Sequence, residues 1–179
     1  MRDFGAQAFR LSRASLETRL VYTGFLVLVS IGLVTMGGME AIRVGVRPAA
    51  IAAHYRGGEI GEEMAFPKTA GALMEVAHFH AFVMAVVFLI LAHLFVATGL
   101  SSRTKGAWIG LAFMSTAADL AGPWMVRYTA GGFAALLVAA WAGMWASYGA
   151  LILGALWEMW GVRPAAGQGV KGYQPCPGR

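Results

Sequence analysis

Four ionisable side chains lie inside one long apolar stretch of the sequence. Glu75, His78, His80 and His93 interrupt the run from Gly71 to Leu100, which is long enough to cross a lipid bilayer. Titratable groups are costly in hydrocarbon, so they mark a functional site unless a neighbouring helix satisfies them. Carboxylate and imidazole groups can bind a metal ion, ligate haem or carry protons. The sequence therefore indicates one of these chemistries at membrane depth.

The spacing of these residues predicts which of them share a helix face. At about 100° per residue, Glu75 and His93 point the same way, and His78 lies within about 60° of both. His80 points about 140° away from Glu75. Glu75 and His78 form a Glu-x-x-His pair, a spacing that lets both side chains reach one metal ion. One such pair is a weak signal, because di-metal helical bundles use two pairs and two further glutamates.

A third metal ligand, Asp119, is predicted from the next apolar run along the chain, Gly106–Tyr128. His78 and Asp119 lie eight and nine residues from the predicted outer ends of their spans, or about 12 to 14 Å deep. Glu75, His78 and Asp119 therefore form the predicted metal site. Pro123 follows Asp119 by four residues and removes the amide that would bond the Asp119 carbonyl.

A structural interpretation of the same residues stands beside the functional one. Arg127 lies two helical turns from Asp119 and can form a buried ion pair with it or with Glu75 of the preceding span, which would hold the second and third spans together. The histidines would then bond to backbone carbonyls. His54, in the predicted external loop, could instead fold down as a further ligand.

Haem is the second candidate cofactor. His78 and His93 are fifteen residues apart, or about 22 Å, which resembles the stacking of two haem ligands on one helix of cytochrome-b-like bundles. The predicted cofactor-binding residues are His54, His78, His80 and His93. Two b-type haems with paired histidines cannot be built within one chain, so a partner ligand would be His54, a methionine or a histidine of a second protein. A quinone headgroup is the third candidate ligand.

Composition restricts the class of protein. Hydrophobic residues make up 58% of the 179 residues and charged residues 13%, which is too apolar for a soluble domain. Cys176 is the only cysteine, so an intrachain disulfide, a CxxC pair and a CxxCH haem attachment are excluded. No P-loop, GxSxG or HExxH motif is present. These features predict lipid and not nucleic acid as a partner, and no catalytic residue is predicted, so enzymatic activity stays open.

Four apolar runs reach the length that spans a bilayer. They are Leu20–Met39, Ala70–Leu100, Gly106–Tyr128 and Ala130–Trp160. The predicted fold class is therefore an all-α four-helix transmembrane bundle. Pro48 predicts a short helix in the one long loop, because proline is favoured in the first helical turn. This loop would cap the outer mouth of the bundle.

Basic residues predict the orientation. Nine lie on one side of the membrane and five on the other. The two sets are Arg2, Arg10, Arg13, Arg19, Arg103, Lys105, Arg163, Lys171 and Arg179, against Arg43, Arg47, Arg56, Lys68 and Arg127. The positive-inside rule then places both termini in the cytoplasm, as in a multi-pass inner-membrane protein.

Three segments follow from this topology. Residues 1–19 form a basic leader that is either an interfacial helix or a frayed tail. Residues 20–162 form the four-helix transmembrane domain, and residues 163–179 a disordered cytoplasmic tail rich in glycine and proline.

The sequence leaves two functions open. The preferred one is a small membrane subunit of an electron-transfer system that binds b-type haem, a transition-metal ion or a quinone at the outer side. The alternative is a non-catalytic anchor or assembly subunit of a larger membrane complex, in which the same polar residues are structural. Either function implies other membrane subunits or further copies of the chain as partners.

Overall fold

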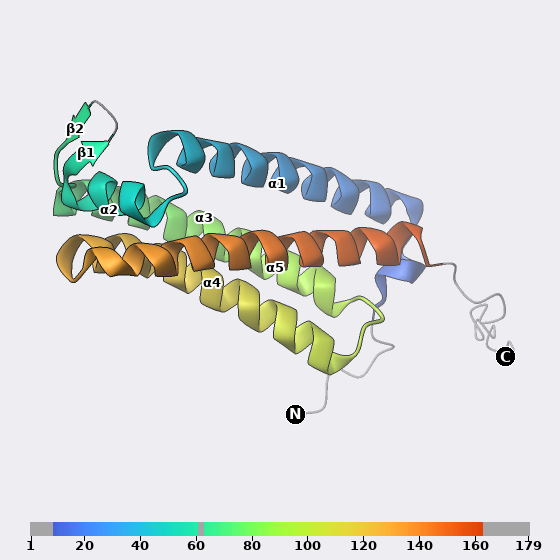
Figure 1. Cartoon of the computed structure of the whole chain (residues 1–179). Coiled ribbons are helices and arrows are strands. Elements are labelled where there is room, and N and C mark those ends of the chain that lie inside the picture. The colour runs from blue at the N-terminus through green and yellow to red at the C-terminus, as the bar shows by residue number, and fades with distance from the viewer. Residues whose placement is uncertain (1–8, 61–62, 163–179) are drawn as a thin grey trace, which may run out of the picture.

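Four long helices lie side by side in the computed structural model, which describes residues 9–60 and 63–162 (Figure 1). They are α1 (Leu16–Arg43), α3 (Ala70–Val96), α4 (Ser102–Tyr128) and α5 (Ala134–Trp160). Each is long and apolar enough to cross a membrane, α5 together with the 3-10 turn that precedes it. The predicted all-α four-helix transmembrane bundle is therefore confirmed.

Hydroxyl residues fix where three of these helices begin. Ser15, Thr69 and Ser101 each accept a hydrogen bond from the backbone N–H three residues ahead. Such caps satisfy amides that have no partner within the helix. Because of them, α1 and α4 begin four residues before the apolar runs that predicted them. Helix α5 instead follows a 3-10 turn, η2 (Gly131–Phe133).

The connection between α1 and α3 covers one end of the bundle, which we call the cap end. It contains the predicted short helix, α2 (Pro48–Arg56), with Pro48 in its first turn. Gly57 ends α2 at φ 84°, a conformation that side chains with a Cβ rarely adopt. Strands β1 (Gly58–Ile60) and β2 (Glu63–Ala65) then pair antiparallel. This hairpin was not predicted.

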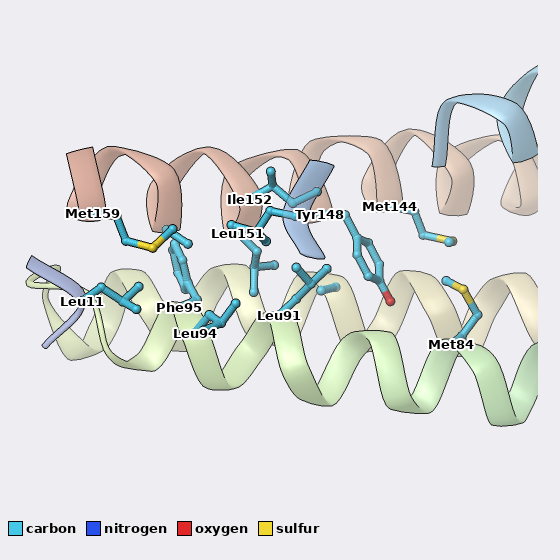
Figure 2. Close-up of a cluster of buried hydrophobic side chains, with 13 residues drawn as sticks. Leu11, Met84, Leu91, Leu94, Phe95, Met144, Tyr148, Leu151, Ile152 and Met159 are labelled. Carbon is cyan, nitrogen blue, oxygen red and sulfur yellow. The ribbon is translucent and has the colours of Figure 1, made fainter. Parts of the chain in front are cut away.

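The main core fills the opposite half of the bundle and the middle. Figure 2 shows side chains of α3 and α5 meeting along its length, from Phe95 and Met159 at one end, where Leu11 of the leader joins them, to Met84 and Met144 at the other. Helix α5 is central, since it contacts α1, α3 and α4. Helix α1 is the least buried of the four spans.

The described part of the leader packs into the end opposite the cap. It forms a 3-10 turn, η1 (Leu11–Arg13), in which Leu11 is fully buried and donates its N–H to the carbonyl of Ala97 at 3.1 Å. Arg19 holds the turn by donating to the carbonyl of Ser12 at 2.8 Å. The leader therefore contacts the bundle itself over these residues. Residues 1–8 and the predicted tail 163–179 lie outside the described residues.

Candidate functional site

A cavity lies at the cap end of the bundle, where His54 and Tyr55 of α2 form part of its lining. It has a volume of about 330 Å³ and is lined by residues from α1, α2, α3, α4 and α5. We call it the cap cavity. A second cavity of about 260 Å³ shares Glu40, His80, Asp119 and Trp141 with it. Polar side chains from four helices therefore meet where the apolar packing is interrupted.

Asp119 is held in place by a tryptophan of the neighbouring helix. The indole Nε1 of Trp141 donates to Asp119 Oδ1 at 2.8 Å. Asp119 lies on α4 and Trp141 on α5. This bond satisfies one carboxylate oxygen and fixes the direction of the Asp119 side chain in the cavity wall.

Glu40 contributes the second carboxyl group of the cavity wall. It lies in the last turn of α1, and its Oε2 atom is buried without a hydrogen-bond partner among the described residues. A buried acceptor left without a donor costs about 1 to 3 kcal/mol, and more when it is charged. This oxygen therefore needs a hydrogen-bond donor, a bound cation or a proton of its own.

The roof of the cavity presents an imidazole and a phenol. His54 and Tyr55 of α2 line the cavity, and their rings meet edge to face with centroids 4.9 Å apart. Burial lowers the pKa of His54 from its ordinary value of 6.5, and the charge of Lys68 lowers this pKa further. Burial also raises the pKa of Tyr55, as do the nearby charges of Glu40 and Asp119. Near neutral pH the roof therefore offers a neutral imidazole and a neutral hydroxyl.

Main-chain carbonyls anchor the cap to the bundle. Arg56 donates from Nη1 to the carbonyl of Val126 at 3.1 Å, at the end of α4. In the opposite direction, Arg127 of α4 donates from Nε to the carbonyl of Lys68, in the chain before α3, at 2.9 Å. The amide of Lys68 donates to the carbonyl of Tyr55 at 3.1 Å. These bonds tie α2 and the chain before α3 to the end of α4.

The structure separates the residues predicted to bind a cofactor into two groups. His54 and His80 line the cap cavity. Glu75, His78 and His93 are exposed on the other side of α3. Within the described ranges, no group of three or more His, Cys, Asp or Glu side chains is placed to hold a metal ion. The predicted ligands Glu75 and His78 are therefore not brought together with Asp119 in one chain.

The direction of α3 explains this division. The positions along a helix fix which residues share a face, but not which face is turned inward. The buried residues Leu73, Met84 and Leu91 lie within about 40° of His80 around the helix. The face that carries His80 therefore lines the cavity, and the face that carries Glu75, His78 and His93 does not.

The predicted ion pair of Asp119 and Arg127 is not formed, since the two side chains have separate partners. Asp119 accepts from Trp141, and Arg127 donates to the carbonyl of Lys68. Glu40 was missed because the first span was predicted to end at Met39, one residue before it. Glu40 could have been found by extending the predicted span, because Glu40-Ala-Ile-Arg43 continues α1 by a full turn.

A bundle of apolar spanning helices with a capped polar cavity at one end defines a multi-pass membrane protein. Residues 45–166 match the family Aq_1264_TM, described as a transmembrane helical domain, and the chain belongs to this family. No curated protein and no solved structure matches the chain. The matched region holds α2 to α5 and leaves out Glu40. The family supports the predicted lipid environment, while the orientation and the inner membrane stay predictions.

Proposed function

We propose that the chain is a membrane subunit of an electron-transfer system that binds a quinol or quinone headgroup in the cap cavity. The unpartnered Oε2 atom of Glu40 carries this proposal. A quinol hydroxyl donates the hydrogen bond that this oxygen lacks. Hydrogen bonds to a charged group contribute about 1.5 to 3 kcal/mol, which is enough to orient a small ring.

The rest of the lining suits an aromatic ring with polar edges. Apolar side chains such as Leu73, Val76 and Leu120 stand beside the carboxyl, imidazole and indole groups. A volume of about 330 Å³ falls within the range of about 300 to 1,000 Å³ of small-molecule sites. Apolar walls with a few convergent polar groups are the usual composition of such sites.

The proton chemistry of the site matches oxidation of a quinol. Oxidation to the quinone removes two electrons and two protons. Glu40 as a carboxylate accepts one proton from a hydroxyl group, and neutral His54 accepts the other. The electrons pass to a redox group on a partner subunit. At the predicted outer side of the membrane, both protons would be released outward.

Haem b and a transition-metal ion are the alternative occupants of the same cavity. His54 and His80, the histidines that line it, would be their ligands. An absorption spectrum of the dithionite-reduced protein, together with metal analysis, separates the three cases. A Soret band or stoichiometric metal that is lost in both His54→Ala and His80→Ala would replace the quinol proposal.

Substitution of Glu40 tests the proposal directly. A short-chain benzoquinol, titrated against the solubilised chain, should quench the fluorescence of Trp141 and Trp124, which line the cavity. Glu40→Leu should weaken binding by about 10- to 100-fold, because a charged hydrogen bond is lost. Glu40→Gln keeps an acceptor oxygen and should bind more tightly than Glu40→Leu. Glu59→Gln, at an exposed position of β1, is the control. Unchanged binding by Glu40→Leu would contradict the proposal.

The alternative function of an anchor or assembly subunit also has an observation in its favour. The exposed Glu75, His78 and His93 of α3 are poorly suited to lipid and need a protein neighbour. If the chain is only an anchor, Glu40→Leu should leave the activity of intact membranes unchanged. Replacement of these exposed α3 residues should then remove it.

A further inference from the structure

The outward face of α3 differs from an ordinary lipid-facing surface. Glu75, His78 and His93 are exposed there, together with large apolar side chains such as Phe82 and Leu89. Over residues 20–42, by contrast, α1 exposes no ionisable side chain, and its large exposed side chains are apolar. Glu75 and His78 lie one turn apart, about 8 to 12 Å along the helix from its first residue. A protein neighbour would remove them from lipid.

The same face carries a row of small residues with a seven-residue period. Gly71, Ala85 and Ala92 occupy this row, with His78 as its fourth member. Gly71, His78 and Ala85 are exposed, and Ala92 is half-buried. A seven-residue period is the register of two helices that cross at a small angle, and small residues let such helices approach closely in lipid. The row and the ionisable pair therefore both favour a contact between this face of α3 and another helix.

We infer that a second copy of the chain packs on this face of α3, and that Glu75 and His78 of both copies bind a divalent transition-metal ion such as Zn²⁺. Both copies insert in the same orientation, so their α3 helices run parallel about a two-fold axis along the membrane normal. Residues at equal depth then face each other across the axis. The site does not depend on the cap cavity, which lies on the other side of α3.

The two-fold axis supplies what one chain lacks. A single chain has one Glu-x-x-His pair, whereas two chains bring two carboxylates and two imidazoles to one depth. Four ligands of these types suit tetrahedral Zn²⁺. The surface is also self-complementary in hydrogen bonding, because Glu75 of either copy can accept a hydrogen bond from His78 of the other. A second copy therefore fits this face better than an unrelated apolar helix.

Cross-linking in native membranes tests the contact. In a Cys176→Ser background, Gly71→Cys places a thiol in the row, where an added Cβ makes only an ordinary contact with Thr69 Oγ1 at 3.9 Å. Ile42→Cys is the matched control, since Ile42 lies at the same end of the bundle on α1 and is 87% exposed. A short bismaleimide should give covalent dimers with Gly71→Cys and not with Ile42→Cys. Equal cross-linking of both, or of neither, would overturn the inferred contact.

Metal binding is tested with Zn²⁺ alone on the solubilised full chain. Calorimetry should give one ion for every two chains, and Zn²⁺ should shift the chain toward dimer in sedimentation. Glu75→Gln and His78→Ala should lose this binding, while His80→Ala, in the cap cavity, should keep it. A dimer that binds no Zn²⁺, or equal loss in all three variants, would overturn the metal site. Quinol binding by Glu75→Gln and His78→Ala should be unchanged, which separates this site from the proposed function.

Discussion

The two halves of the bundle satisfy their polar groups in different ways. In the packed half, Tyr148 is fully buried and its hydroxyl lies 2.9 Å from Thr116 Oγ1, while Ser147 donates to the carbonyl of Gly143 at 2.7 Å. In the cap half, two cavities interrupt the packing, and Glu40 keeps a buried oxygen without a partner. Unmet hydrogen-bonding capacity thus coincides with empty space. This coincidence separates a ligand site from buried polar residues that serve the fold.

Truncation in the packed half should have the largest effect on stability. Leu151 is 1% exposed and Leu153, on the same helix, is 67% exposed. Leu151→Ala should lower the free energy of unfolding by about 2 to 5 kcal/mol, because it leaves a cavity in the core. Leu153→Ala should change it by less than about 0.5 kcal/mol. Unfolding in mixed micelles measures both. Similar losses in the two variants would mean that the core is not packed as described.

Loss of the Trp141 donor should have a smaller effect, located in the cap half. Trp141→Phe strands an oxygen of Asp119 and should lower the free energy of unfolding by about 1 to 3 kcal/mol. It should also weaken quinol binding, because Asp119 is no longer oriented. Adding Asp119→Leu should recover most of the stability but not the binding, since both partners are then apolar. If binding recovers as well, Asp119 is structural.

The pH dependence contributed by His54 should be the smallest effect. Its pKa in the folded chain is below the ordinary 6.5, so the unfolded chain takes up this proton first as the pH falls. Stability should therefore be unaffected by His54 above about pH 6.5 and should decrease below it, until His54 also protonates in the fold. His54→Asn should flatten this part of a plot of unfolding free energy against pH. A wild-type plot that rises as the pH falls would contradict a neutral His54.

Local signals in the sequence predicted much of the fold. Apolar length predicted the four spans, and Pro48 predicted α2, because proline acts through the backbone at its own position. The ends of α1 were less predictable. By composition, polar residues at a helix end resemble a loop, so the predicted span stopped short of them. Ser15 is nevertheless the N-cap of α1, and Arg43 lies in its last turn.

The site was predicted only in part, for a physical reason. Asp119 and His54, both named as candidate ligands from the sequence, line the cap cavity. The angle between His80 and Glu75 was predicted, but not which of the two faces inward, because α3 is apolar almost all round and its composition does not mark the inward face. The bond between Trp141 and Asp119 depends on how α4 and α5 pack, which no local pattern specifies.

The attachment of the cap has a consequence for how this family can vary. Arg56 and Arg127 reach carbonyl oxygens and not side chains of the partner segment. Every residue type has such a carbonyl, so the end of α4 and the chain before α3 can change their side chains without releasing the cap. Substitutions should therefore be tolerated at Lys68 more readily than at the two arginines, whereas Val126 is fully buried and is constrained by its packing. Relatives with quite different cap sequences could still close the cavity in the same way.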